Sequence, residues 1–413
     1  MPKIIGIDLG TTCSKAAVWD DDRQAAVVIP NLEGNRITPS VAGFDQAGQV
    51  FIGDDVEKNH INFENSAANI AREMDRDDYV IQNGKHYKPQ VISAFILRYL
   101  KQCAEAYLGE PVFDAVITCP VYYTEVQRKA LRDAGTMAGL NVHRTINSST
   151  AAAIALGTEK HSEVEDKIFM VCDLGGDAFN LSVVEFGDVI TVDGTGGDTR
   201  VGGLEMDEAV TQWAVRQIRQ QYGADLSSDA GVRYRLMTAA AALKKTLTVS
   251  ESASLCVPNL ALVDGHALSP DLKITRAQFD ALVTPILRRV TRCIEESMGS
   301  VFETNGIGWE DIDGCLLVGG CSHLPVFQKI MRELFEQHCP GKKPEFRMDV
   351  NPDEAAAMGA AILGTKWAAI GIPPDRDESE KLEAQGHNLT FKETDPDIEL
   401  LDVTSHTLGI ALD

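Results

Sequence analysis

The stretch Ile4–Trp19, IIGIDLGTTCSKAAVW, decides how the rest of the chain is interpreted. An apolar run leads into Asp-Leu-Gly, small residues follow, and a second apolar run can pair back on the first as a β-hairpin. A variant of the same stretch returns as IFMVCDLGGDAFNLSVV, Ile168–Val184. Two copies of one acidic, glycine-containing hairpin predict an internal duplication.

Each copy is followed by alternating strand and helix patterns. Apolar residues at helical spacing predict helices over Lys88–Tyr107 and Thr275–Phe302, with Thr275 as the N-cap of the second. Two halves that begin with a hairpin and finish with helices predict an α/β protein of two lobes with a cleft between them. We expect lobe I over residues 1–166 and lobe II over 167–372, with a return of the chain to lobe I near its end.

The composition excludes some classes of function. A formal charge of −23 argues against a surface for nucleic acid or an anionic membrane, because phosphate groups recruit Lys and Arg. It does not exclude a nucleotide in a small pocket. Nine cysteines without a Cys-x-x-Cys pair predict free thiols in a reducing compartment, and no apolar run approaches the ~20 residues of a membrane helix. We therefore expect a cytoplasmic protein that binds neither nucleic acid nor membrane.

The turns of the two hairpins suit an anionic ligand. Glycine lets backbone N–H groups approach a phosphate without a Cβ clash. Gly10, Thr11 and Thr12 provide such a turn in the first hairpin, and Gly175 and Gly176 provide one in the second. Two such turns predict a clamp that closes on a polyphosphate from opposite sides.

Two further features complete this candidate site. Gly319 and Gly320, between a strand and a helix, would add helix-terminal amides to the same ligand. Asp8 and Asp173, at matching places in the two hairpins, suit a hydrated Mg²⁺ between the lobes. One Asp-x-Gly turn is usually only a turn, but two in register together with a Gly-Gly junction favour a site. Lys244 and Lys245 by themselves are interpreted as part of a solvated helix face.

Taken together, these segments resemble the nucleotide-binding domain of the 70-kilodalton heat-shock chaperone (DnaK-type) family. The resemblance runs from about Lys3 to Thr365 and resumes at LLDVT. It implies the actin-like ATPase fold, with two duplicated lobes around a nucleotide cleft. The motifs that carry it, in chain order, are GIDLGTT, AEAYLGEPV, PVYYTEVQRKALRDAGTMAGLNVHRTIN, STAAAIALG, DLGG, GDTRVGG, LKKTLT, LLVGGCSHLP and NPDEAAAMGAAI.

The resemblance also implies a ligand, because the family binds ATP or ADP with Mg²⁺ in its cleft. Asp8 and Asp173 fall on the carboxylates that hold the metal and orient water, and are the predicted catalytic residues. Pro120 and Arg128 match a relay that passes the nucleotide state to a neighbouring domain. The phosphate-contacting positions are Gly10, Thr11, Thr12, Gly175, Gly176, Gly202 and Gly203, and the adenosine side comprises Lys244, Lys245, Thr248, Gly319, Gly320 and Asp353.

Departures from the family pattern are concentrated where hydrolysis takes place. In the order of the chain they are Ala71 for a catalytic lysine (Arg72 after a one-residue slip), Ser148 for a glutamate, Asp177, Ala178 and Asn180 for Gly, Thr and Asp of the second turn, Ala241 for a glutamate and His323 for an arginine. Losing one preorganised electrostatic group typically costs ~10²–10³ in rate. A carboxylate such as Asp177 about 4 Å from a phosphate costs up to ~4 kcal/mol at an effective dielectric of 20, unless it turns outward or ligates the cation.

The favoured function is therefore a chaperone-family nucleotide-binding domain with weak or absent ATP hydrolysis and weakened or lost nucleotide binding, signalling to a linker or a protein partner. Two alternatives stay open. One is a slow but working chaperone ATPase that controls a peptide-binding domain and its clients. The other is a nucleotide-independent scaffold, a pseudo-ATPase whose lobes dock a partner. A small-metabolite kinase of the same fold is disfavoured by the relay and linker motifs.

The C-terminal part of the chain has a different character. Residues 373–403 comprise a charged segment followed by IELLDVT, which resembles the family's apolar interdomain linker. Ser405 stands where a proline usually follows. Residues 404–413 are expected to be the stub of a following β-domain.

Overall fold

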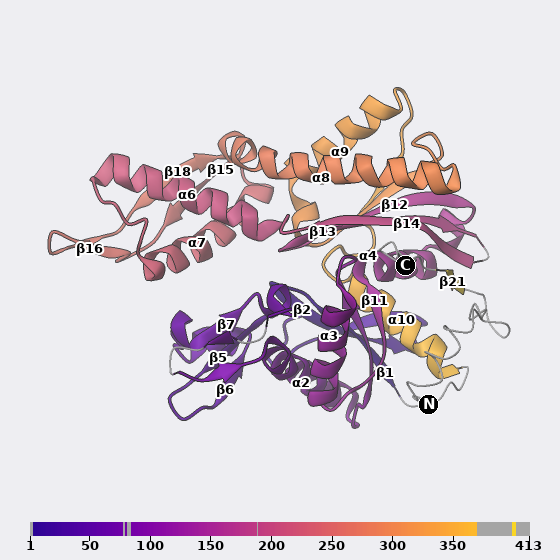
Figure 1. Cartoon of the computed structure of the whole chain (residues 1–413), viewed down its shortest axis with the longest axis horizontal. Coiled ribbons are helices and arrows are strands. Elements are labelled where there is room, and N and C mark those ends of the chain that lie inside the picture. Colours follow the sequence, from indigo (N-terminus) through magenta and orange to yellow (C-terminus); the bar gives the residue numbers. More distant parts are fainter. Residues whose placement is uncertain (1–2, 77–78, 81–83, 188, 370–398, 402–413) are drawn as a thin grey trace, which may run out of the picture.

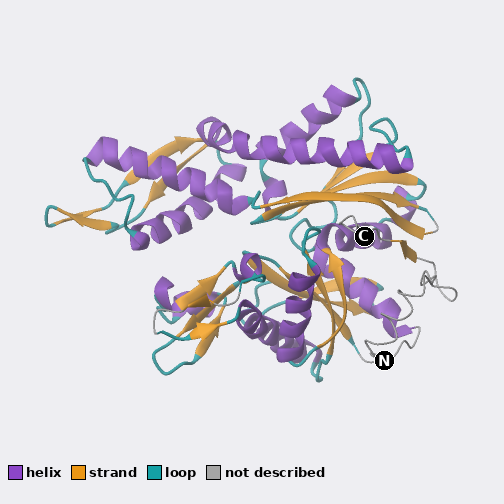
Figure 2. Ribbon diagram, in the orientation of Figure 1, coloured by secondary structure: helices purple, strands orange, loops and turns teal. Residues whose placement is uncertain are grey.

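The first lobe is built on a six-stranded sheet that contains the first hairpin (Figures 1 and 2). The structure is a computed structural model that describes residues 3–76, 79–80, 84–187, 189–369 and 399–401. The hairpin strands are antiparallel, and β1 is parallel to β10 on its other side. The sheet has the order β11-β10-β1-β2-β3, with β4 beside β2, and its strands are β1 (Ile4–Leu9), β2 (Cys13–Asp20), β3 (Ala25–Ile29), β4 (Thr38–Pro39), β10 (Asp114–Cys119) and β11 (Asn141–Asn147).

The second lobe repeats this sheet around the second hairpin. Its hairpin strands are again antiparallel, and β12 is parallel to β19 just as β1 is parallel to β10. The order is β20-β19-β12-β13-β14-β21, formed by β12 (Lys167–Leu174), β13 (Ala178–Phe186), β14 (Val189–Thr199), β19 (Gly314–Val318), β20 (Glu345–Arg347) and β21 (Glu399–Leu401). The shared strand order is the pattern that a duplicated α/β unit produces.

Two helices, α4 (Ser148–Glu159) and α10 (Ala355–Ala369), join the lobes. Both are alanine-rich, and their side chains share one buried core with residues of both sheets, such as Val116 and Phe169. Glycines allow this close packing. A Cβ on Gly359 would lie 1.7 Å from the carbonyl oxygen of Ala151, and one on Gly6 would lie 2.1 Å from the nitrogen of Ala361.

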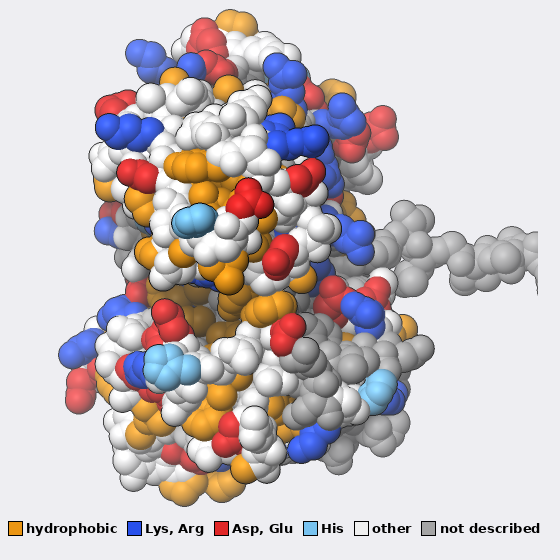
Figure 3. Space-filling view, turned by 90° about the vertical axis from the view of Figure 1, so that its left-hand side faces the viewer, with side chains coloured by type: hydrophobic (Ala, Val, Ile, Leu, Met, Phe, Trp, Pro, Cys, Tyr) orange, Lys and Arg blue, Asp and Glu red, His pale blue; other side chains and the backbone are white. Residues whose placement is uncertain are grey.

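The remaining elements pack around the two sheets, and among them β5, β6 and β7 of the first lobe and α6, α7, β15, β16 and β18 of the second extend toward one side of the molecule (Figure 1). Seen from that side, the surface is hollowed between the lobes (Figure 3). In the first lobe they are α1 (Asp54–Lys58), α2 (Pro89–Leu108), α3 (Glu125–Met137), β5 (Val41–Phe44), β6 (Val50–Ile52), β7 (Ser66–Ala68), β8 (Tyr79–Val80), β9 (His86–Tyr87), η1 (Phe63–Asn65) and η2 (Ile70–Glu73), with α5 (His161–Val164) after α4. In the second lobe they are α6 (Gly203–Tyr222), α7 (Ala230–Val249), α8 (Arg276–Asn305), α9 (Pro325–His338), η3 (Gly320–His323), β15 (Ser252–Cys256), β16 (Ala261–Val263), β17 (His266–Leu268) and β18 (Asp271–Thr275).

Two predictions from local pattern, one helix and one helix N-cap, are confirmed. The helix expected over Lys88–Tyr107 is α2, and Thr275 caps α8 in a reciprocal capping box with Gln278. All nine cysteines are free. Within the described ranges, no helix is both long and apolar enough to cross a membrane.

The predicted charged segment and linker lie largely outside the described residues. The exception is β21, which pairs in parallel with β14 at the edge of the second sheet. The predicted stub of a β-domain, 404–413, lies wholly outside them.

The contact between α4 and α10 leads to a stability prediction. Gly359→Ala should lower the free energy of unfolding by 1–3 kcal/mol or more, because a Cβ there overlaps the backbone of α4. Gly299→Ala is the matched control, since a Cβ at this exposed position of α8 meets open space, and it should raise stability by about 0.5–1 kcal/mol. Urea denaturation of both variants measures the difference. Equal stabilities would show that the packing between α4 and α10 does not constrain the fold.

Candidate functional site

The turns of the two hairpins meet where the lobes join. Gly176 lies directly on Thr12, since a Cβ there would be 2.5 Å from Thr12 Cγ2 and 2.6 Å from Thr12 Oγ1. Gly10 and Thr11 complete the first turn, and Ser40 Oγ donates to the Gly10 carbonyl at 2.6 Å. The structure therefore brings together the two glycine-containing turns that the sequence predicts as halves of one clamp.

Asp8 is held from both sides by its neighbours in the sheet. Thr118, beside it on β10, donates from Oγ1 to Asp8 Oδ1 at 2.8 Å. Lys15, opposite it on β2, donates from Nζ to Asp8 Oδ2 at 3.0 Å. Both carboxylate oxygens of Asp8 therefore already accept a hydrogen bond from the protein.

Lys15 is a site residue that the sequence analysis missed. It stands seven residues after Asp8, just as Asn180 stands seven after Asp173, and each faces its aspartate across its own hairpin. Counting the register of the first hairpin would have found it. Burial acts to lower the pKa of Lys15, but Asp8, together with Cys13 and Asp353, outweighs this and holds the pKa above its usual range. A fixed positive charge therefore stands beside Asp8.

The surroundings of Asp8 do not fit the predicted Mg²⁺. A cation on this carboxylate would lie beside the Lys15 ammonium, and two unit charges 4 Å apart repel by about 4 kcal/mol at an effective dielectric of 20. Within the described residues, no group of three or more His, Cys, Asp or Glu is arranged to hold a metal. The metal role of Asp8 and Asp173 stays a prediction, and the side chains present argue against it.

Asp173 is enclosed by the second lobe. Its Oδ2 accepts from Asn180 Nδ2 at 3.2 Å, and Asn180 Oδ1 in turn accepts from the backbone of Val121 in the first lobe at 2.9 Å. Burial, with Asp8 nearby, raises the pKa of Asp173 to about 6, although a hydrogen bond from Ser148 acts in the opposite direction. Gly319, at φ +81°, packs on this carboxylate, and a Cβ there would lie 2.6 Å from Asp173 Oδ1.

The second turn is bound to the start of α6. The amides of Gly203 and Leu204 donate to the carbonyls of Gly175 and Gly176 at 3.0 and 2.7 Å. A Cβ on Gly202 would lie 2.7 Å from the backbone of this turn. Gly175, Gly176, Gly202 and Gly203 are therefore neighbours, but the N–H of Gly203 is used by the protein itself.

Arg72 crosses from the first lobe to the second turn. Its guanidinium pairs with the buried carboxylate of Asp177, and it donates to Glu205 Oε1 in the first turn of α6 at 2.5 Å. Asp177 thus neither turns outward nor faces a phosphate unpaired. Ala71 is buried, with its carbonyl accepting from the Tyr123 hydroxyl, so the cation facing the second turn is that of Arg72. Arg72 Nε and Glu205 Oε2 are buried with no hydrogen-bond partner among the described residues.

On the predicted adenosine side, Lys244 departs from its interpretation as a solvated residue. Its ammonium donates to the Gly203 carbonyl at 2.8 Å and to the buried Asp207 at 2.9 Å. The interpretation from sequence was wrong because the pairing carboxylate lies on α6, outside the helix of Lys244. Lys245 is exposed, and the Thr248 hydroxyl donates to the Lys245 carbonyl at 2.7 Å.

The remaining predicted residues of this side form a small group beside Gly319. Asp353 pairs with His323 at 3.1 Å, and a Cβ on Gly320 would lie 3.3 Å from Asp353 Oδ1. Since Gly319 packs on Asp173, these residues lie next to Asp173 at the turn of the second hairpin.

The predicted relay residues, Pro120 and Arg128, lie near the second hairpin. Arg128 donates to the carbonyls of Val121 and Tyr123, both at 3.2 Å, and to Asn147 Oδ1 at 2.7 Å. It therefore holds the loop that follows Pro120, and this loop is the one whose Val121 N–H binds Asn180. The relay role of Pro120 and Arg128 stays a prediction.

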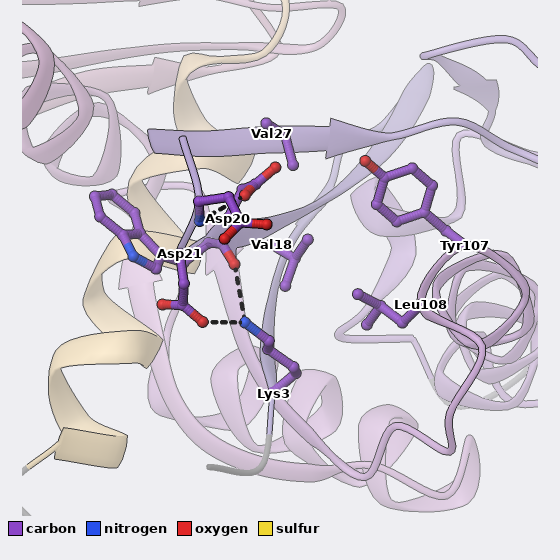
Figure 4. Close-up of a pocket in the computed structure, with 9 residues that line it drawn as sticks. Lys3, Val18, Asp20, Asp21, Val27, Tyr107 and Leu108 are labelled. Carbon is purple, nitrogen blue, oxygen red and sulfur yellow. Dashed lines mark hydrogen bonds and ion pairs between the residues drawn. The ribbon is translucent and has the colours of Figure 1, made fainter. Parts of the chain in front are cut away.

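One pocket lies apart from these residues, on the first lobe (Figure 4). Its volume is about 270 Å³, and Lys3 Nζ donates across it to Asp21 at 2.6 Å. The lining residues are Lys3, Val18, Trp19, Asp20, Asp21, Asp22, Val27, Tyr107 and Leu108. None of them belongs to the predicted site, so this pocket is separate from the clamp.

Comparison with known proteins identifies relatives along the whole chain. The family model described as Hsp70 protein matches residues 4–413. Chaperone protein DnaK of Thermotoga neapolitana is 38% identical over 410 residues, which are 98% of this chain and 63% of that protein. Chaperone protein DnaK of Thermosipho melanesiensis is 38% identical over 409 residues, again 98% of this chain and 63% of that protein. The chain thus spans less than two thirds of these curated relatives.

The raised pKa of Asp173 predicts a pH-dependent stability. The folded protein holds this proton more tightly than the unfolded chain, so ionised Asp173 costs folding free energy above pH 6 and the cost disappears below about pH 4. A pKa near 6 instead of 3.8 corresponds to about 3 kcal/mol. Asp173→Asn should therefore be more stable than the wild type by up to this amount at neutral pH, and equally stable at pH 4.

Urea denaturation between about pH 4 and 7.5 tests this prediction. The surface variant Asp22→Asn is the control and should follow the wild type throughout. Parallel pH profiles for Asp173→Asn and the wild type would contradict the assignment.

The bridge between the lobes predicts strong coupling between Arg72 and Asp177. Arg72→Met leaves a buried carboxylate unpaired, so it should destabilise more than Arg72→Met combined with Asp177→Ala. A double-mutant cycle should give a coupling energy on the order of 1–3 kcal/mol. The exposed pair Lys329–Glu333 provides the control cycle and should give about 0.5 kcal/mol or less. Equal coupling in the two cycles would show that the bridge does not hold the lobes.

Proposed function

The chain belongs to the Hsp70 family, and from this premise we propose that its nucleotide-binding domain holds ATP or ADP between the two lobes and hydrolyses ATP weakly or not at all. The family resemblance and the actin-like ATPase fold expected from the sequence are confirmed by the match over residues 4–413. Binding, the hydrolysis rate and the coupling to a linker or partner are the proposed part.

The arrangement of the turns supports a phosphate ligand. Gly176 meets Thr12 across the two lobes, and Gly319 brings the strand–helix junction onto Asp173. Glycine at the second turn and at the junction lets the backbone there come close to Thr12 and Asp173, and glycine-containing turns of this kind can bind anions. Arg72 also keeps a buried Nε with no hydrogen-bond partner in the described part of the chain, so an anion at the second turn would meet an unused donor.

The ion pairs of Arg72 with Asp177 and Glu205 are the main observation in support of weak ATP hydrolysis. Enzymes transfer phosphoryl groups by positioning them and by neutralising the charge that develops. Here the cation facing the second turn is paired with two carboxylates, one of which belongs to the turn itself. The two carboxylates largely neutralise the positive charge of Arg72 before a phosphate binds.

Ser148 adds to this effect. A carboxylate near the phosphates can accept a proton from water or hold a water in place, whereas a serine hydroxyl is a poor base at neutral pH. Ser148 instead donates to the Cys119 carbonyl at 3.5 Å and acts to lower the pKa of Asp173. Losing one preorganised group costs ~10²–10³ in rate, so we expect a deficit of at least this size.

A nucleotide-independent scaffold is the second candidate, and one observation favours it. The first amides of α6, at Gly203 and Leu204, already bind carbonyls of the second turn. These contacts fix the second turn within its own lobe, and Arg72 joins that turn to the first lobe, so protein groups alone hold the arrangement. In this candidate the closed lobes would dock a partner or client protein without a nucleotide.

We also propose that the cleft signals to the linker. Residues of the predicted linker form β21, which pairs with β14, and β14 pairs with β13 of the second hairpin. A change at the second turn would therefore reach the linker through two neighbouring strands. A cytoplasmic location and a protein client are part of the same proposal.

Calorimetric titration with ADP and ATP, followed by single-turnover hydrolysis, tests the function. We expect ADP to bind and ATP to turn over at least 10²-fold more slowly in the unmodified protein than in the variant Ala71→Lys with Ser148→Glu. The same substitutions at exposed positions, Ala242→Lys with Ser228→Glu, are the control and should leave the rate of ATP hydrolysis as low as in the unmodified protein.

Each other outcome selects a different function. Rapid turnover by the unmodified protein would contradict weak hydrolysis and favour the working ATPase. A protein that binds neither nucleotide yet remains folded would be the scaffold.

A further inference from the structure

We propose that this site binds the phosphate groups of a nucleotide without a divalent metal, and that the ammonium of Lys15 supplies the positive charge beside Asp8. This inference rests on the proposed nucleotide binding and adds the chemistry by which the phosphates are held. It starts from the disagreement between the predicted Mg²⁺ and the side chains that surround Asp8.

The position of Lys15 follows from the hairpin register. Asp8 and Lys15 are directly opposite each other on β1 and β2, and their charged groups are 3.0 Å apart. The Lys15 side chain is only 11% exposed, so the ammonium cannot turn away into solvent. The same hairpin carries Gly10, Thr11 and Thr12, and the charge is therefore fixed close to the first turn.

The ammonium has capacity for a ligand. Lys has three N–H donors and no acceptor. Among the described residues, Lys15 donates to Asp8 and, at the long distance of 3.5 Å, to the Cys13 carbonyl. The remaining N–H is available to a phosphate oxygen, which is a group that Lys binds as a point charge.

The charge of Lys15 acts on the site as a whole. It lowers the pKa of Asp173, and Asp353 acts to raise the pKa of Lys15 itself. The ammonium contacts Asp8 and interacts electrostatically with two further carboxylates, from the second hairpin and from the segment before α10. Part of the positive charge that a metal would supply is therefore already present in Lys15.

The matching position in the second hairpin supports this assignment. Asn180 faces Asp173 with a neutral amide that donates to the carboxylate at 3.2 Å. Neither of the two equivalent positions carries a further carboxylate, and one of them carries a cation. The two positions opposite the aspartates thus add one positive charge and no negative charge.

The wild-type protein tests the proposal directly. Calorimetric titration with ADP is performed once in excess Mg²⁺ and once in excess EDTA. We expect the two dissociation constants to agree within about twofold, and manganese alone to show no bound signal in electron paramagnetic resonance. Binding that is lost in EDTA would overturn the proposal while leaving nucleotide binding in place. Binding under neither condition would overturn both.

Lys15→Met separates the ammonium from the rest of the site. This variant should lose at least tenfold in ADP affinity in EDTA, equal to about 1.4 kcal/mol, recover affinity when Mg²⁺ is added, and bind Mn²⁺. Lys329→Met, at an exposed lysine of α9, is the matched control and should behave like the wild type. Unchanged affinity of Lys15→Met in EDTA would show that Lys15 only supports the fold, and would overturn the proposal.

A double variant covers the case in which Lys15→Met does not fold. Lys15→Met with Asp8→Asn removes both charges of the buried pair at once, so no carboxylate is left unpaired. It should also lose at least tenfold in affinity for ADP in EDTA. Retained affinity would again overturn the role of Lys15.

Discussion

The contact of α4 with α10 is the constraint on which the rest of the molecule depends. Gly359 lies so close to the Ala151 carbonyl that no side chain fits between the helices, and Gly6 brings β1 equally close to α10. Both sheets pack on this pair of helices within one buried core. Because the core is continuous across the lobes, the packing fixes the distance between the turns of the two hairpins. Gly176 then reaches Thr12, and the candidate site is a consequence of this packing.

Within that frame, three carboxylates at or near the second turn and the first hairpin are paired with cations of the protein. Asp8 has Lys15, Asp177 has Arg72, and Asp207 has Lys244. A buried carboxylate without a partner costs several kcal/mol, so each pair is needed for folding once its acid is present. The number of carboxylates on each cation decides the chemistry, since Arg72 pairs with two of them, whereas Lys15 pairs with one and keeps an N–H for a ligand. Asp177 and Arg72 matter most, because their pair also links the lobes.

Features that depend on local pattern could be predicted from the sequence, and features that depend on long-range pairing could not. The hairpins, the duplicated halves and the Thr275 cap follow from periodicity and short-range chemistry. Arg72 meets Asp177 only through the folding of both lobes, so Asp177 was expected to oppose a phosphate and its partner was not foreseen. Lys244 was interpreted as solvated because its carboxylate lies on another helix. Lys15 is an intermediate case, since the hairpin register alone places it opposite Asp8.

Two kinds of contact, close backbone packing at glycines and pairing of polar side chains, explain how such a fold can be kept while its chemistry changes. The lobes are joined by backbone approach at Gly6, Gly176 and Gly359, where any side chain would overlap its neighbour. Ser148, by contrast, uses its hydroxyl within the site and leaves the backbone contacts of α4 intact. Exchanging a side chain of this second kind alters charge and proton transfer but does not move the lobes. A charge that is added must still find a partner, which Asp177 does in Arg72. The fold therefore does not tolerate a side chain at these glycines, whereas it tolerates a new charged residue as long as a partner of opposite charge is present.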